Sequence, residues 1–191
     1  PGGAPCETLH LAPMPGGRFV RGYSGRLFVA AGDTLWFSEP LRPHLTAPRH
    51  NFIRFVGDIR IVEFVAGGVY VGDDRGVWWL AGTDPTQYIQ QQASDAVAVA
   101  RSSVLVPMHR LGVLDSRAAA DCAVWLSADG YMVGAPGGQV TALHPDRIRL
   151  APQVAGQSVF LLRDGIQQIV TLTASPGPAS VFGGAIDTAT H

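Results

Sequence analysis

The sequence lacks several features that would assign it to a class at once. It contains no lysine, and charged residues make up only 15% of its 191 positions. Its 14 basic residues nearly balance 15 acidic ones, and the formal net charge of -1 gives no preference for nucleic acid or an anionic membrane. Nowhere do about 18 apolar residues run without interruption, so we predict no membrane-spanning helix.

Cysteine and histidine are too sparse to indicate a disulfide framework or a metal site. Cys6 and Cys122 have no CxxC spacing, and Cys122, in "DCAVWL", is expected to be a small buried apolar residue. No histidine has a second histidine or a cysteine at ligand spacing. His44 and His50 lie in a proline-rich stretch and are best explained as loop residues. We therefore predict no metal. The histidines are residues 10, 44, 50, 109, 144 and 191.

Phosphate-binding and nucleophile motifs are also missing. The glycine pairs do not form GxGxxG, and a Walker A motif is excluded because there is no lysine. Ser24, in "GYSGR", lacks the second half of GxSxG. We therefore predict no cofactor.

The carboxylates give no catalytic pattern. Asp73 and Asp74 lack the alternating acidic pattern of a calcium loop and suit a hairpin turn. Glu39 and Glu63 are expected near strand ends, but a glycosidase needs two carboxylates at a set separation, and nothing in the sequence brings these together. We predict that the chain is not an enzyme and assign no catalytic residue.

Glycine and proline break the chain into short segments. The 23 glycines and 14 prolines leave few windows for a helix of average length, which favours short strands. The best helical candidates are "DPTQYIQQQ" (84–92) and "DSRAAADC" (115–122), each expected to give at most a turn or two.

Four hairpins stand out as paired apolar runs around turn residues. They cover residues 26–39, 67–82, 122–135 and 158–172. Their bends are expected at Gly32–Asp33, at Asp73–Gly76, at Asp129–Gly130 and at Asp164–Gly165. The last two Asp-Gly pairs can supply the positive φ angles of primed turns.

The hairpins recur at a spacing typical of a β-propeller. With Leu27, Val69, Ala123 and Val159 as equivalent starts, the spacings are 42, 54 and 36 residues, close to the roughly 40 to 50 residues of a four-stranded blade. The remaining blade strands are expected in residues 51–56, 59–65, 96–108 and 137–143. We predict an all-β, propeller-like fold, complete or part of a larger propeller. Its expected divisions are an N-terminal extended segment (1–21), the propeller-like domain (22–173) and a C-terminal linker or arm (174–191).

The aromatic pairs fit packing between blades better than a binding site. Adjacent residues in a strand face opposite sides, so Trp78 and Trp79 cannot share one pocket without a bulge. We expect them, with Trp36, Phe37 and Trp125, to bury apolar area between sheets. The glycines expected to form the turns are Gly76, Gly130 and Gly165.

Residues 22–85 and 121–143 resemble virion structural proteins of tailed bacteriophages. The likeness lies in the order of four features: "LWFSEP", then "FIRF", then "GGVYVG" ending in "GTDP", and "WLSADG" followed by "GGQV". Some members of this class are similar to the propeller-bearing nozzle or stabilisation proteins that close the tail of short-tailed phages. Those proteins are generally much longer than 191 residues.

The resemblance implies a structural component of a phage tail or neck, located in the virion. It implies a homo-oligomeric ring that forms part of the DNA conduit, with DNA only in transit. It also implies a mount for adjacent tail proteins such as an adaptor, fibre or spike. The alternatives are a carbohydrate-active or ligand-binding β-propeller and an adaptor domain of a cellular protein.

Overall fold

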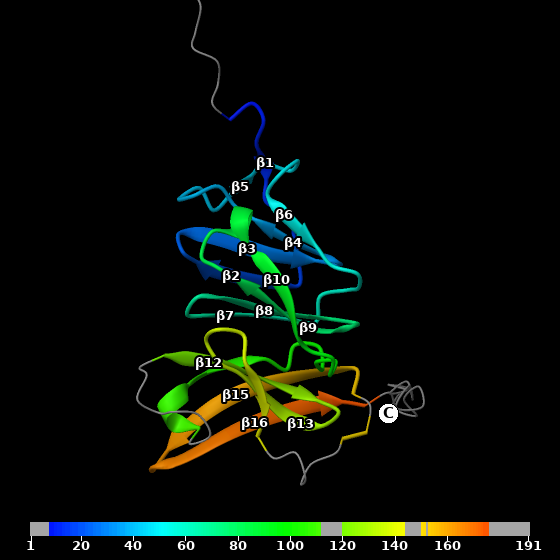
Figure 1. The fold of residues 1–191 in the computed structure, drawn as a ribbon, viewed down its shortest axis with the longest axis vertical. Helices are drawn as coiled ribbons and strands as arrows, with labels where there is room; N and C mark the ends of the chain where they lie inside the picture. The colour runs from blue at the N-terminus through cyan, green and yellow to red at the C-terminus, as the bar shows by residue number, and fades with distance from the viewer. Residues whose placement is uncertain (1–7, 112–119, 144–149, 152, 176–191) are drawn as a thin grey trace, which may run out of the picture.

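The described chain is all-β, which confirms the all-β part of the expected fold. The computed structural model describes residues 8–111, 120–143, 150–151 and 153–175. Within them, three antiparallel sheets of four strands are followed by a two-stranded sheet (Figure 1). A small ladder pairs β1 (Ala12–Pro13) with β5 (Leu45–Thr46).

The strands of each sheet are neighbours in chain order. The first sheet contains β2 (Phe19–Tyr23), β3 (Arg26–Ala31), β4 (Thr34–Phe37) and β6 (Phe52–Arg54). The second contains β7 (Ile61–Val65), β8 (Gly68–Asp73), β9 (Gly76–Ala81) and β10 (Ile89–Ser94). The third contains β11 (Val104–Pro107), β12 (Asp121–Ser127), β13 (Gly130–Gly134) and β14 (Val140–Ala142). The fourth contains β15 (Ala155–Arg163) and β16 (Ile166–Ala174).

All four predicted hairpins are present. The predicted turn type is right at one of two bends and wrong at the other. Asp164 and Gly165 have φ angles of 51° and 78°, which confirms the primed turn between β15 and β16. The primed turn predicted at Asp129–Gly130 is wrong. Ser127 pairs with Gly130, so the two loop residues are 128 and 129, and only Gly130, with φ 97°, has a positive angle.

The fourth hairpin does not occupy the repeat position predicted for it. Leu27, Val69 and Ala123 lie in the second strands of their sheets, whereas Val159 lies in the first strand of its sheet. The regular repeat is instead between first strands. Strands β2, β7, β11 and β15 begin at residues 19, 61, 104 and 155, and the spacings are therefore 42, 43 and 51 residues.

Helical structure in the described segments is limited to two single 3-10 turns, Pro85–Gln87 and Met108–Arg110. The first follows Asp84, whose carboxylate accepts a hydrogen bond from the Thr86 backbone N–H, as expected of an N-cap. The rest of the 84–92 candidate is wrong, because Ile89–Gln92 pair with β9. Most of the 115–122 candidate lies outside the described residues.

Apolar clusters fill the space between successive sheets. One joins the first and second sheets, one the second and third, and one the third and fourth. Trp78 contacts the first cluster and Trp79 belongs to the second, which confirms that they point to opposite faces. Trp125 is fully buried in the second cluster, 5.5 Å from the Tyr70 ring. In the second and third sheets, apolar residues on both faces of the strands therefore follow from packing on both sides.

Replacing Gly130 by valine should lower the free energy of unfolding by about 1 to 3 kcal/mol, because a β-branched residue is strained at positive φ. Urea unfolding of the purified chain measures this change. Gly22→Ala is the matched control, since Gly22 has no positive φ and its added methyl group meets nothing within 4 Å. Equal stability of Gly130→Val and the wild type would show that the turn tolerates another backbone conformation.

Candidate functional site

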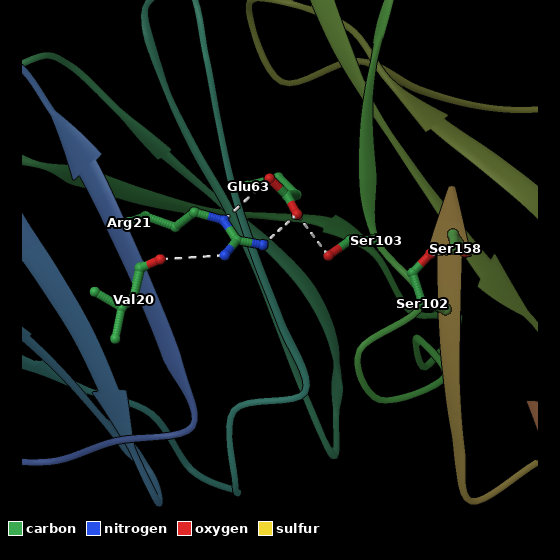
Figure 2. Close-up of polar contacts among 6 residues, drawn as sticks. All are labelled: Val20, Arg21, Glu63, Ser102, Ser103 and Ser158. Carbon is green, nitrogen blue, oxygen red and sulfur yellow. Dashed lines mark hydrogen bonds and ion pairs between the residues drawn. The ribbon is translucent and has the colours of Figure 1, made fainter. Parts of the chain in front are cut away.

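A buried carboxylate lies in the middle of β7. Glu63 is only 3% exposed, in the otherwise apolar strand "IVEFV". A buried charge must be paired and hydrogen-bonded, because its loss of water is costly. Arg21 of β2 supplies the pairing: its Nη2 lies 2.9 Å from Oε1 of Glu63 and its Nε 3.5 Å from Oε2. Ser103, just before β11, donates from Oγ to Oε1 at 2.9 Å (Figure 2).

The line of polar contacts continues to the fourth sheet. Ser158 of β15 donates a hydrogen bond from Oγ to the backbone carbonyl of Ser102 (Figure 2). The Ser102 hydroxyl bonds in turn to the carbonyl of Val99 and accepts from the backbone N–H of Leu126. We call Arg21, Glu63, Ser102, Ser103 and Ser158 the first-strand polar row, because each lies on, or directly before, the first strand of a sheet.

The sequence reasoning missed this row, although a signal was present. Arg21 and Glu63 are single charged residues of opposite sign in two apolar strands, 42 residues apart. Ser103 follows Glu63 after 40 residues. The first interval equals the 42-residue spacing of β2 and β7, so Arg21 and Glu63 hold corresponding positions, each the third residue of its strand, whereas Ser103 lies one residue before β11. A repeat aligned on first strands would have placed Arg21 and Glu63 together.

The geometry gives the row a structural function. Arg21 contacts both oxygens of Glu63, and Ser103 donates a further hydrogen bond to Oε1. A carboxylate held in this way joins three sheets through charge-assisted hydrogen bonds. Arg21 is about two-fifths exposed, and Glu63 is therefore paired from the solvent side.

Glu39, the other carboxylate considered for a glycosidase pair, has a different partner. Glu39 accepts a hydrogen bond from the Asn51 side chain at 2.7 Å, and no described contact joins Glu39 to Glu63. The pair that a glycosidase requires is therefore not assembled by these contacts.

The two adjacent aspartates of the β8–β9 turn have different environments. Asp74 pairs with Arg60 at 2.6 Å. Asp73 is buried, and its Oδ1 accepts from the backbone N–H of Arg75 at 2.8 Å. Its Oδ2 has no hydrogen-bond partner among the described atoms. The turn is thus held by an Asx-type bond, as the hairpin interpretation expected.

Two surface carboxylates show lowered pKa values. The side chain of Arg54 donates to Asp33 and, with Thr34, lowers the pKa of that carboxyl. Hydrogen bonds from the backbone N–H and hydroxyl of Thr86 lower the pKa of Asp84. Both shifts come from local turn and strand contacts.

His44 and His50 are exposed turn residues, which confirms the loop interpretation. His10 and His50, with Arg49, line an open hollow of about 650 Å³, whereas His44 is not part of its lining. In the described ranges, no three histidine, cysteine, aspartate or glutamate side chains gather into a metal-binding group. No helix within those ranges is long and apolar enough to cross a membrane. His144 and His191 lie outside them.

Cys122 is a buried member of the cluster between the third and fourth sheets, as predicted. Its thiol donates to the carbonyl of Val106 at 3.1 Å. Burial raises the pKa of the Cys122 thiol to about 11. The thiol therefore packs as a neutral apolar group.

No protein-family model matches the chain. No curated protein matches it.

Replacing Arg21 by methionine should lower the free energy of unfolding by about 1 to 3 kcal/mol, because Glu63 then stays buried without its charged partner. Denaturant unfolding gives the value. In a Glu63→Gln background the same change should cost less, since no buried charge is stranded. Arg54→Met is the matched control: its pair with Asp33 is exposed and should contribute at most about 1 kcal/mol. Equal losses for Arg21→Met and Arg54→Met would contradict a special role for Glu63.

The raised thiol pKa of Cys122 predicts a pH-dependent loss of stability. Since the pKa rises from 9.0 to about 11 on folding, the folded state retains the proton more strongly than the unfolded state. The stabilisation is complete below pH 9 and is lost as the pH rises toward 11. The free energy of unfolding should be measured for the wild-type chain and for Cys122→Ala across this pH range. The difference between the two removes the contribution of other titrating groups. A difference that stays constant with pH would show that the thiol is not shielded.

Proposed function

We propose that this chain is part of a β-propeller and serves as a structural component of a tailed-phage tail or neck. The observation that carries the proposal is the first-strand polar row. In a propeller, blades of four antiparallel strands repeat radially about an axis. Bonds from Arg21 to Glu63, from Ser103 to Glu63 and from Ser158 to Ser102 tie the first strands of successive sheets, or the residues just before them. Such bonds suit blades that share an axis.

The spacing and order of the strands also favour a propeller. Each of the first three described sheets is a four-stranded antiparallel meander. Their first strands begin 42 and 43 residues apart, within the blade length of about 40 to 50 residues. Strand β7 lies against β2 and also contacts β12, and β15 lies against β11. We therefore infer that the chain contributes three blades and two strands of a fourth.

The phage assignment comes from the sequence resemblance, and each of its features has a definite place in the fold. "LWFSEP" ends β4, the third strand of the first sheet, and "FIRF" contains β6, the fourth. "GGVYVG" contains β8, and "GTDP" forms the turn into Pro85–Gln87. "WLSADG" is the β12–β13 hairpin, and "GGQV" leads into β14. The features thus fall on the third and fourth strands of the first sheet, the second strand of the second sheet and the β12–β13 hairpin of the third.

A scaffold function also agrees with how the carboxylates are used. Glu63 and Glu39 each bind a side chain from another part of the chain. We infer that the chain contributes to a ring of identical subunits around the DNA path, in contact with adjacent tail proteins such as an adaptor, fibre or spike.

Native mass determination of the assembly isolated from its source tests this function. A multiple of six or twelve copies, in particles that also contain other tail proteins, is expected. The denatured mass of the subunit should accompany this measurement. A monomer of 20.2 kDa, absent from virions, would contradict the proposal and make a ligand-binding propeller the next hypothesis.

A further inference from the structure

The first sheet has an apolar face that points away from the second sheet. Phe28, Ala30 and Leu35 belong to the cluster shared with the second sheet, so their neighbours along the strands point to the opposite side. Four uncharged residues on that side pair with one another across the strands and form a continuous row. They are Val20, Val29, Trp36 and Phe52. We call this side the outer face of the first sheet.

A strap of the chain, residues 9–17, lies over this outer face. It contains β1 and leads into β2, and Figure 1 shows β1 and β5 on the side of the first sheet that faces away from the second. Gly17 touches the face itself, since a Cβ added there would overlap a methyl group of Val29 and the carbonyl of Ala30. Val29 is only 3% exposed, although it belongs to none of the three clusters between the described sheets. The strap therefore takes the place that a neighbouring sheet takes elsewhere in the described chain.

The strap is weakly held. None of residues 8–18 is itself buried. The two pairs of the β1–β5 ladder fix the strap, together with hydrogen bonds from the Met14 N–H to the carbonyl of His44 and from the Arg18 N–H to that of Ala30. Residues 9–12 also line the open hollow of about 650 Å³, so they are not close-packed. Segments with few buried contacts open locally while the rest of the fold stays intact.

We propose that residues 9–17 are a releasable strap, and that the outer face of the first sheet, once uncovered, packs against the same face of a second copy of this chain. Such an isologous contact brings one patch against itself. The row of Val20, Val29, Trp36 and Phe52 suits this contact because it has no charge that would be repelled by its own copy. Arg54, at the end of β6 on the same face, is already paired with Asp33.

Face-to-face packing is also how the described sheets of one chain already meet. With the strap in place, the same face is closed to a second copy. The strap thus controls when two copies can join. The inference goes beyond the proposed function, because it rests on the contacts of the strap alone and would hold outside a virion.

Gly17→Ala tests the release of the strap. The added methyl group cannot fit between the strap and the sheet, so the amides of Met14 and Arg18 should exchange at least about tenfold faster than in the wild type. Gly16→Ala is the matched control, since a Cβ there meets nothing within 4 Å and neither glycine has a positive φ. Residue-resolved amide hydrogen exchange of the dilute, intact chain gives these rates. Equal rates in the two variants overturn the proposal, as does a wild-type strap protected as strongly as β8.

A disulfide across the ladder tests whether the strap blocks association. Ala12 and Thr46 are directly opposite each other, close enough for cysteines at both positions to be bridged. The double variant Ala12→Cys, Thr46→Cys is made with Cys6→Ser and studied by sedimentation equilibrium. Its reduced form should dimerise at least about tenfold more tightly than its oxidised form, which has the same sequence and is the matched control. Equal association of both forms, or a disulfide that joins two chains, overturns the proposal.

Val20→Glu tests whether the outer face is the contact. Val20 is 53% exposed, so a charge there costs the monomer little, but the dimer would bury it. In the Gly17→Ala background, Val20→Glu should weaken dimerisation by about tenfold or more. Ile89→Glu, at a 64% exposed position of β10, is the matched control and should leave dimerisation unchanged. Equal effects of the two charges, or a Gly17→Ala chain that stays monomeric, overturn the proposal. Detection of the chain in virions would leave the proposed function intact in every case.

Discussion

The fold depends on one constraint: its second and third sheets are apolar on both faces, so each must be covered on both sides. Strand β8 shows this most clearly, since all of its residues are buried. Val69 and Val71 point to the first sheet, while Tyr70 points to the third. Burial of apolar area is the main favourable term in folding, but it has no direction. Apolar faces alone would let one sheet slide over the next.

A few polar contacts between the sheets fix the position of one sheet relative to the next. Glu63 can be buried only where Arg21 and Ser103 both reach it, which restricts how the second sheet lies against its neighbours. Tyr70 acts similarly, because its hydroxyl donates to the carbonyl of Ala135 across the interface. The close approach requires Gly134, where an added Cβ would lie 2.6 Å from the Tyr70 ring. Burial raises the pKa of Tyr70, which keeps this donor protonated.

The sequence predicted local structure better than it predicted the site. Hairpins were found because turn chemistry and apolar alternation act over a few residues, as at Asp164–Gly165. The strands β2 and β10 were missed, since "FVRGY" and "IQQQAS" have weak apolar patterns and are placed by their partners. Gly134 and Ser103 gain their roles from residues 64 and 40 positions away, respectively, and no local pattern reports such contacts. The same distance hid the Arg21–Glu63 pair.

The same constraint explains why the end of the described chain differs from its middle. A sheet in the middle is covered by one neighbour on each side, whereas the fourth sheet has only the third below it. Its strands are nevertheless the longest in the described chain, and β16 contains no charge that would protect its edge from pairing. The aliphatic residues on the outer face of this hairpin therefore stay exposed in the described chain.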